Sequence, residues 1–545
     1  MKTSNNIIHQ FTILLLCVAV WAASADPHQD FLSCLVQNHS DPIGMSNVIS
    51  TPNSTSYSSI LNATVQNLRF ALPSTPKPRV IITPDHESQI QTAIYCSKKH
   101  GLQVRILSGG HDFEGSSYVA EVPFFVLNMF NFRSVSVDAN SRTAWVGSGA
   151  TLGETYYNIV RVNTSLAYPA GYYPTVAIGG HVSGGGYGPL LRKWGLAADN
   201  VVDARVVDAN GRILDRASMG EDLFWAIRGG VGASFVVILE YKIRLVEVSN
   251  EVTAFSLKRT LEQDATKLVY KWQNVSHKLP EDLLLELQLT VVQSNQTGNR
   301  TVQATFVGLF EGGVDQLVGI MNESFPELGL AKEDCVQLSS WVDFIPYFFE
   351  LPLNSTYRIL LTRVPPPTPK SSFKSTADFV QQPIPEEGLK KIWDVLLEIP
   401  SPPVQMNWTP FGARMAAIPA SEIPFPHRGE NIFMVFKKVQ WQGTSPELAQ
   451  ERFAAARKLH SVIGEFVENN PRRAYADYRD LDLGVNNIGE TSVEKARIWG
   501  GPYFRNNFDR LVNVKTMVDP DDYFRNEQSI PPRPSHSCQS NQEST

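Results

Sequence analysis

Three glycine-rich segments are the part of this sequence best suited to hold a reactive ligand. They cover residues 108–115 (SGGHDFEG), 171–188 (GYYPTVAIGGHVSGGGYG) and 229–232 (GGVG), and the second has seven glycines in eighteen residues. Glycine lets the backbone approach a ligand closely, and consecutive amide groups form nests for phosphate oxygens. Each segment alone fits a tight turn equally well, but together they predict one large anionic ligand. So many glycines also argue against a helix within residues 171–188.

Other sequence features exclude several commoner sites. Neither a Walker A loop (G-x-x-x-x-G-K-[ST]) nor a well-placed Rossmann G-x-G-x-x-G is present, which argues against ATP and nicotinamide cofactors. The cysteines have no metal-ligand spacing and no carboxylate pair stands out, so no metal site is predicted. The formal net charge of -6 gives no electrostatic reason to bind nucleic acid.

The first glycine-rich segment follows a predicted strand, helix and strand. Residues 79–83 (RVIIT) are β-branched and predict a buried strand. Pro84 opens a predicted helix whose apolar residues recur at helical spacing, and Gly101 stands where a helix ends. Residues 102–107 form a second predicted strand that runs straight into SGGHDFEG. This order of elements is typical of nucleotide-binding domains.

The middle of the chain has a different pattern. Residues 285–290 (LELQLT) alternate leucine with Glu, Gln and Thr, which predicts a strand with one apolar and one polar face. The region to about Gly443 is rich in such strands and is interpreted as a substrate domain. Ser445 starts a long predicted helix that stops at residues 469–471 (NNP). The segment 475–532 is expected to rejoin the first domain.

The N-terminus predicts passage through the secretory pathway. Residues 1–25 combine a basic Lys2, an apolar run at 11–21 and an A-x-A cleavage signal at 23–25, as in a signal peptide. No later stretch approaches the roughly 20 apolar residues of a membrane helix, so no membrane association is expected. Sequons predict surface sites for glycosylation at Asn38, Asn53, Asn62, Asn163, Asn274, Asn295, Asn299, Asn322, Asn354 and Asn407.

Motifs spread over nearly the whole mature chain resemble those of the plant berberine bridge enzyme-like flavoproteins, which include cannabinoid synthases and monolignol oxidases. They are FLSCL (31–35), IYCSKK (94–99), SGGHDFEG, GGHVSGGGYG, DLFWAIRGG (222–230), IPFPHR (423–428), YRDLDLG (478–484) and FRNEQSIPP (524–532). The resemblance implies an α+β fold: a two-part FAD-binding domain of the PCMH or vanillyl-alcohol-oxidase type with an inserted antiparallel-sheet substrate domain. The expected boundaries are 1–25 for the signal peptide, 26–76 and 77–248 for the FAD domain, 249–470 for the substrate domain, 471–532 for the returning FAD segment and 533–545 for a disordered tail.

The resemblance also implies how FAD is held. His111 matches a histidine bonded covalently to the flavin 8α-methyl group; its alternative role is an ordinary hydrogen bond. Tyr173 replaces a cysteine that forms a second flavin bond in most members, so only one bond is expected, and Val176 matches an oxygen-gating residue. Further flavin contacts are expected from Ser108, Gly109, Gly110, Asp112, Gly179, Gly180, Ser183, Gly184, Gly186 and Tyr187. The likeness implies a disulfide between Cys34 and Cys96, whereas the sequence alone leaves the four mature cysteines open as thiols.

Catalytic residues are less well defined. Tyr478 matches the general base of cannabinoid synthases, and its alternative is a tyrosine that packs under the flavin. Gln288 matches a substrate-contacting histidine, and its alternative is simple solvent exposure. Met434 and Phe436 occupy positions where relatives place a Glu, Gln or Lys base; neither can transfer protons, and both are assigned with Thr409 to the substrate pocket. Val231 and Val236 stand where glycines are usual, which predicts altered flavin contacts.

Four functions remain open from the sequence. The favoured one is an oxidase of plant specialised metabolism that transfers hydride from a phenolic or prenylated aromatic substrate to FAD, with O2 as acceptor. A second is an intermolecular Diels-Alderase joining a prenyl-derived diene to a chalcone-type dienophile, which needs orientation but no base. A carbohydrate oxidase and a flavin-binding storage glycoprotein are less favoured. The expected form is a monomer in the apoplast, another extracellular space or the vacuole.

Overall fold

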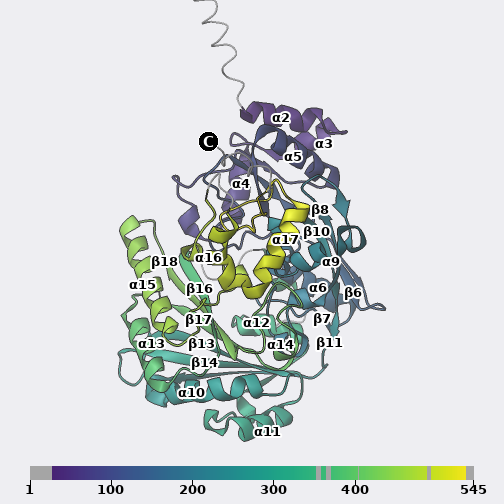
Figure 1. The fold of residues 1–545 in the computed structure, drawn as a ribbon. Coiled ribbons are helices and arrows are strands. Elements are labelled where there is room, and N and C mark those ends of the chain that lie inside the picture. Colours follow the sequence, from purple (N-terminus) through teal and green to yellow (C-terminus); the bar gives the residue numbers. More distant parts are fainter. Residues whose placement is uncertain (1–26, 352–356, 364–369, 403, 488–491, 535–545) are drawn as a thin grey trace, which may run out of the picture.

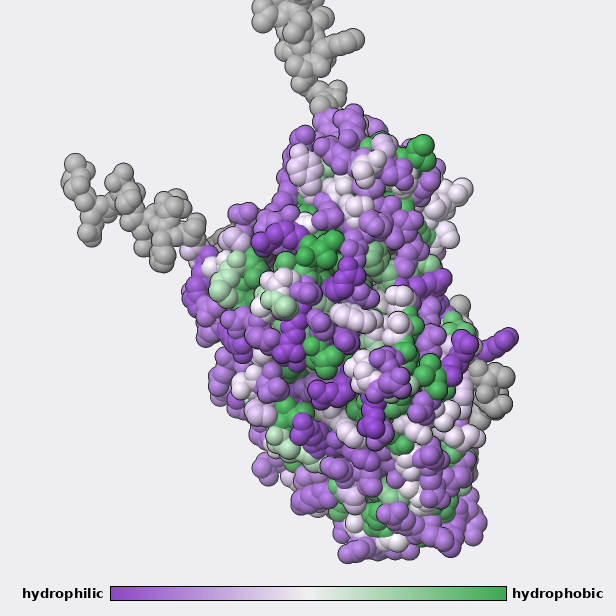
Figure 2. Space-filling model, turned by 90° about the vertical axis from the view of Figure 1, so that its right-hand side faces the viewer, coloured by the Kyte–Doolittle hydropathy of each residue, from purple (hydrophilic) through white to green (hydrophobic). Residues whose placement is uncertain are grey.

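A computed structural model describes residues 27–351, 357–363, 370–402, 404–487 and 492–534. The predicted signal peptide, the sequon at Asn354 and all but the first two residues of the predicted tail lie outside these described residues. Among them, no helix is both long and apolar enough to cross a membrane. Figure 2 shows a face on which hydrophilic residues dominate and hydrophobic residues form small separate groups.

The N-terminal half contains two larger sheets and a two-stranded sheet of β7 and β11, and the family fold class α+β is confirmed by these mixed helices and sheets. In the first sheet three strands run parallel in the order β2, β4, β3, with β1 antiparallel at the edge. The second sheet is antiparallel, in the order β5, β6, β10, β8, β9. The strands are β1 (Ile49–Ser50), β2 (Val80–Ile82), β3 (Gln103–Leu107), β4 (Phe124–Asn128), β5 (Val135–Asp138), β6 (Thr143–Gly147), β7 (Leu166–Ala167), β8 (Val201–Val207), β9 (Ile213–Leu214), β10 (Val237–Arg244) and β11 (Val246–Glu247).

The predicted strand, helix and strand before the first glycine-rich segment are confirmed as β2, α5 and β3. The helix α5 (Glu87–His100) begins three residues later than Pro84, because the His86 side chain accepts a hydrogen bond from the Ser88 amide and caps it there. Gly101 ends the helix with φ +66°, a left-handed conformation that glycine adopts without a Cβ clash. The other helices of this half are α2 (Pro27–Gln37), α3 (Pro42–Asn47), α4 (Thr55–Thr64), α6 (Leu152–Val162), α7 (Ile178–Ser183), α8 (Leu191–Trp194) and α9 (Arg216–Ala226).

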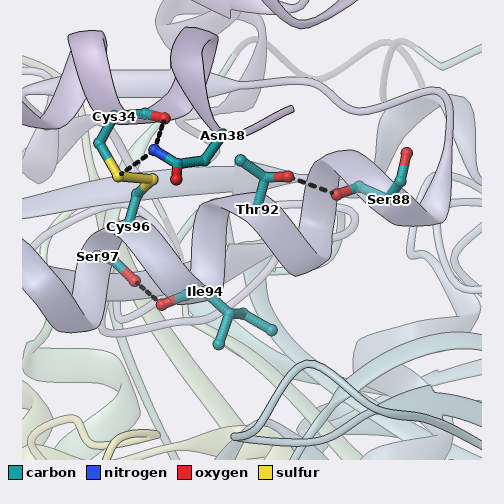
Figure 3. The surroundings of a disulfide bond; sticks show 7 residues. All are labelled: Cys34, Asn38, Ser88, Thr92, Ile94, Cys96 and Ser97. Carbon is teal, nitrogen blue, oxygen red and sulfur yellow. Dashed lines mark hydrogen bonds between the residues drawn. A yellow bond between two sulfur atoms is a disulfide. The ribbon is translucent and has the colours of Figure 1, made fainter. Parts of the chain in front are cut away.

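The expected disulfide is confirmed. Cys34 on α2 and Cys96 on α5 are bonded, with their Cα atoms 5.8 Å apart (Figure 3). Asn38 donates a hydrogen bond of 2.9 Å to the Cys34 carbonyl oxygen one turn earlier. Phe31 and Leu35 are buried on the same helix, so the crosslink joins two helices that already share an apolar core.

A seven-stranded antiparallel sheet forms the middle of the chain, in the order β15, β12, β14, β13, β17, β18, β16. The strands are β12 (Val252–Thr260), β13 (Leu283–Gln293), β14 (Arg300–Phe310), β15 (Cys335–Leu338), β16 (Ser372–Val380), β17 (Gln405–Pro410) and β18 (Phe433–Trp441). The helices of this region are α10 (Ala265–Val275), α11 (Val314–Ser324), α12 (Phe344–Phe348), α13 (Glu386–Glu398), α14 (Ala413–Ala417) and α15 (Pro446–Gly464). In Figure 1 the sheet lies at the bottom, and α10, α13 and α15 cover its outer face, where the leucines of β13 join an apolar core.

The C-terminal segment packs against the N-terminal half. Its helices α16 (Val493–Phe504) and α17 (Phe508–Val518), yellow in Figure 1, lie beside the N-terminal half and above the large sheet. Arg479 pairs with Asp112 at 2.8 Å, and the buried Lys515 ammonium donates to the Ser234 carbonyl oxygen at 2.7 Å. These contacts attach the C-terminal segment to the N-terminal half near the first and third glycine-rich segments.

Candidate active site

A cavity of about 420 Å³ lies where the three parts of the chain meet. One wall consists of the glycine-rich segments, and the opposite wall is the inner face of the seven-stranded sheet. The segment around Tyr478 closes one side. The segment 171–188 is not wholly irregular: α7 forms within it, which corrects the expectation of no helix there. A turn and a half is possible because Ile178 and Val182 of α7 are fully buried, and this packing offsets the weak helix propensity of glycine.

Most predicted flavin contacts line this cavity. The lining includes Ser108, Gly109, Gly110, His111, Asp112, Tyr173, Val176, Gly179, Gly180, Ser183, Gly184 and Tyr187. Gly186 lies just behind the wall, where its amide donates a hydrogen bond of 2.9 Å to the Tyr475 hydroxyl. The glycine-rich segments therefore form one continuous surface although they are far apart in sequence.

At two of these positions neighbouring atoms lie so close to the backbone that a side chain larger than hydrogen would clash with them. Gly110 has φ +72°, and a Cβ there would lie 2.6 Å from the Thr64 carbonyl oxygen. A Cβ on Gly184 would lie 1.9 Å from a carboxylate oxygen of Asp477, which also lines the cavity. Burial raises the pKa of Asp477 to about 7, and the Tyr475 hydroxyl donates to this carboxyl at 2.8 Å.

His111 is positioned as a neutral side chain on the cavity wall. Its Nε2 lies 3.0 Å from the Thr175 hydroxyl, and burial lowers the pKa of the imidazole to about 4. The ring meets Tyr173 edge to face, with ring centroids 5.6 Å apart. Tyr173 thus fills space beside His111 with a phenol ring.

Unpaired polar atoms indicate where a phosphate-bearing cofactor fits. Arg105, Ser116 and Ser117 all line the cavity. The Arg105 Nη1 and both serine hydroxyls are buried without a hydrogen-bond partner among the described residues. Unsatisfied buried donors are costly, and phosphate oxygens are suitable acceptors for all three. Arg105 is held in place by Glu527, 2.6 Å from its Nη2. These donors, the glycine surface and the neutral His111 fit FAD.

Aromatic rings surround Tyr478 at the opposite side of the cavity. Its ring stacks on Phe113 with centroids 5.2 Å apart and planes 10° apart, and Phe436 lies 4.7 Å away. The Tyr478 hydroxyl forms a hydrogen bond with the hydroxyl of Tyr187. Burial, together with Tyr187, raises the pKa of Tyr478 well above its usual value, so the phenol is neutral at rest.

Glu286 on β13 is a cavity residue that the sequence analysis did not select. The Tyr172 hydroxyl donates to its Oε2 at 2.5 Å, and the Thr409 hydroxyl donates to its Oε1 at 3.3 Å. Burial raises the pKa of this carboxyl to about 7, partly offset by these hydrogen bonds. The sequence signal that could have identified Glu286 is its position between two leucines on a predicted strand. An acid that is buried there needs specific hydrogen-bond partners and is therefore a candidate for a functional role.

Three residues assigned to the substrate site lie outside the cavity wall. Gln288 is on the same face of β13 as Glu286, but one pleat further, opposite Asn407 and half-buried. Met434 packs opposite Thr409 at the other end of β18, in the core of the N-terminal half. Thr409 lies beside Glu286 on the neighbouring strand β17 and donates a hydrogen bond to its carboxyl. Of the predicted pocket residues, Phe436 lines the cavity.

Two further predictions are modified by the tertiary structure. Asn407, a predicted surface sequon, lines the cavity and is buried, because β17 is a central strand of the sheet. Val231 lines the cavity with φ +61°, a left-handed conformation that a β-branched residue rarely adopts. Val236 is fully buried beside it. In the described part of the chain, no cluster of His, Cys, Asp and Glu can hold a metal ion.

Comparison with known proteins supports the class of site. Residues 78–216 match the family described as FAD binding domain, and residues 474–531 match the family described as berberine and berberine like. The two matches cover the first two glycine-rich segments and the segment with Tyr478. The fold and the cavity are therefore those of an FAD-binding oxidoreductase.

Similar proteins span almost the whole chain. Cannabidiolic acid synthase-like 1 from Cannabis sativa is 47% identical, over 94% of this chain and 94% of its own. Tetrahydroberberine oxidase from Berberis wilsoniae is 44% identical, over 97% of this chain and 99% of its own. This chain belongs to the berberine bridge enzyme-like family of FAD-linked oxidoreductases.

Solved structures agree with this assignment. The structure of BBE-like protein number 28 from Arabidopsis thaliana has a TM-score of 0.86 and 43% identity, covering 93% of this chain and 100% of its own. The grass pollen allergen Phl p 4, described as a glucose dehydrogenase, has a TM-score of 0.85 and 39% identity, with coverage of 93% and 100%. An isoleucine-to-valine variant of Phl p 4 is described as a glucose oxidase.

Proposed function

We propose that this protein is an oxidase that takes hydride from a phenolic or prenylated aromatic substrate and passes the electrons to O2. The observation that carries the proposal is the hydroxyl pair of Tyr478 and Tyr187 in the cavity wall, close to the buried carboxyl of Glu286. FAD, when bound, supplies the hydride acceptor. The aromatic lining suits a planar substrate better than a polyol, which needs several convergent polar groups.

The protein's own task in this reaction is to move a proton. Tyr478 accepts the proton of the substrate phenol while passing its own proton to Tyr187. The Tyr187 hydroxyl lies near Thr409 and Glu286, and the Thr409 hydroxyl donates a hydrogen bond to Glu286 at 3.3 Å. Because the pKa of Glu286 is about 7, its carboxylate is able to receive a proton at neutral pH. The substrate loses one hydride and one proton, and O2 gains two electrons and two protons to give H2O2.

The covalent bond between His111 and the flavin 8α-methyl group belongs to the same proposal. It is supported by the position of His111 on the cavity wall and by the burial that keeps the imidazole unprotonated and nucleophilic. Tyr173 offers no thiol for a second bond. Reaction with O2 is supported by Val176 in the cavity wall, since Phl p 4 is described as an oxidase when one isoleucine is changed to valine.

Secretory targeting is also part of this proposal. The Cys34–Cys96 disulfide supports it, because disulfides persist in oxidising compartments. The predicted signal peptide directs the chain to the same route, with the extracellular space or the vacuole as its destination.

The Diels-Alderase is the second candidate, favoured by Phe436 in the cavity where relatives carry a base. The test of both uses purified holoenzyme in air with candidate prenylated phenols, with and without a chalcone. Flavin absorbance, H2O2 and products are followed together. Flavin bleaching without air and H2O2 in air are expected for the oxidase. Adduct formation with an unchanged flavin spectrum and no H2O2 would contradict it and support the cycloaddition.

A further inference from the structure

One end of the cavity carries polar side chains that the proposed reaction does not use. On β18 the alternate residues Phe436, Lys438 and Gln440 face the cavity, and Gln405 faces it from the neighbouring strand β17, opposite Lys438. Gln405 is exposed, so this end reaches the surface. Phe436 contacts Tyr478, and two residues along a strand span about 7 Å. Lys438 is therefore about one aryl ring from the proposed reaction centre.

Lys438 differs from its neighbouring lysines in having neither an ion pair nor a hydrogen bond among the described residues. Its ammonium lies 4.5 Å from the centroid of the Phe373 ring, and no carboxylate pairs with it among the described residues. Lys437, on the opposite face of the strand, pairs with the fully buried Asp378. Lys370 also lines the cavity, but it donates to three backbone carbonyl oxygens at 3.0, 3.1 and 2.9 Å. Lys438 is thus the cavity lysine whose donors remain available.

The surroundings of Lys438 favour an anionic ligand. Burial lowers the pKa of this ammonium to about 8, so it is mostly charged at neutral pH. The nearby titratable groups are Lys370, which is cationic, and His111, which is neutral. Asp112 is already paired with Arg479, and Glu286 lies towards the other end of the sheet wall. A half-buried cation without a partner gains most from a ligand that brings the opposite charge.

We propose that Lys438 binds the carboxylate of an aromatic acid, with Gln405 and Gln440 as neighbouring hydrogen-bond donors. The substrate class is then a hydroxyaryl carboxylic acid, which places its phenol at Tyr478 and its acid group at the open end of the cavity. The assignment of the phenol end rests on the proposed function, whereas the carboxylate subsite stands on Lys438 alone.

The test measures ligand binding to the holoenzyme by the change in flavin absorbance. The probes are 4-hydroxybenzoate and 4-hydroxycinnamate, each compared with its neutral primary amide. We expect the acids to bind roughly tenfold or more tightly than the amides in the unchanged protein, because a charge-assisted hydrogen bond is lost in the amide. Lys438→Met removes this preference and Lys438→Arg keeps it.

Lys390→Met is the matched control, because Lys390 is exposed on α13 and forms a surface ion pair with Glu387. It is expected to keep the acid preference. Flavin content and the thermal midpoint establish that each variant is folded. Equal affinity for acid and amide in the unchanged protein would overturn the proposal, as would an acid preference that survives in Lys438→Met.

Binding and turnover separate this inference from the proposed function. If the acids bind through Lys438 but neither bleach the flavin nor yield H2O2, the carboxylate subsite stands and the oxidase proposal fails for these substrates. If amides and acids are oxidised alike with no effect of Lys438→Met, the oxidase stands and the subsite is refuted.

Discussion

Replacing Glu286 by glutamine is the most informative perturbation of this site. The amide keeps the size of the carboxyl and can still accept the hydrogen bond from Tyr172, but it cannot take up a proton. If Glu286 is the final proton acceptor, substrate oxidation in the unchanged protein rises as pH increases through about 7, because the carboxyl must be ionised to receive a proton. Glu286→Gln should oxidise substrate more slowly and lose that rise.

The same substitution has a predictable effect on stability. Burial raises the pKa of Glu286 from its ordinary 4.5 to about 7, which corresponds to about 3 kcal/mol at about 1.4 kcal/mol per tenfold change. A raised folded-state pKa stabilises the fold fully below pH 4.5, and this contribution is lost as pH rises through 7. Above pH 7 the buried carboxyl is ionised and destabilises the folded state, whereas glutamine carries no charge and has no such effect. The stability of Glu286→Gln relative to the unchanged protein should therefore increase between pH 4.5 and 8.

Two assays check this reasoning on the holoenzyme. Thermal midpoints of both proteins are measured from pH 4.5 to 8, and their difference should grow by on the order of 3 °C for a chain of this length. Oxidation rates with one phenolic substrate are measured over the same range. A constant difference in midpoint, or a rate profile that keeps its rise near pH 7 in Glu286→Gln, would refute the role assigned to this carboxyl.

Four further predictions follow from the cavity and the crosslink. Tyr478→Phe should lower the oxidation rate by 10²- to 10⁴-fold with little change in flavin content, and near-normal turnover would exclude Tyr478 as the base. His111→Ala should release yellow flavin into the supernatant on acid precipitation, whereas the unchanged protein should keep it in the pellet; colour in both supernatants argues against the covalent bond. Val231→Gly should stabilise the fold by about 1 kcal/mol in thermal unfolding, because it relieves a left-handed valine, and a lower midpoint contradicts that strain. Cys34→Ala with Cys96→Ala should cost about 4 kcal/mol for a sequence separation of 62, and an unchanged midpoint would show that the crosslink does not limit stability.

Much of the secondary structure follows from local sequence. The helix over residues 87–100 has periodic apolar residues and ends at Gly101. The long helix from Pro446 follows Ser445, whose hydroxyl accepts a hydrogen bond from the Leu448 amide and caps the helix. These signals lie within a few residues of the elements they define, so they can be recognised without the fold. The motifs also indicated the family, since each glycine-rich segment must keep its backbone close to the cofactor.

The sequence could not identify which polar residue of the large sheet does chemistry. Alternation in residues 285–290 predicted correctly that Glu286 and Gln288 share a face. It could not decide between them, because one pleat moves a side chain about 7 Å along the strand without changing its face. The same limit applies to Asn407, whose sequon suggested a surface position although it lines the cavity.

The sequence by itself determined many of the helices and strands, the glycine-rich segments and the family, because these depend on local backbone preferences and on motif residues that are close in sequence. Only the tertiary structure placed Glu286 against Tyr172 and left Lys438 without an anionic partner at the cavity's open end. Glu286 and Tyr172 are 114 residues apart in the sequence, and the surroundings of Lys438 depend on which strands meet in the large sheet. Burial and pairing, which set the protonation and charge of a group, arise from such contacts and not from the residue type alone.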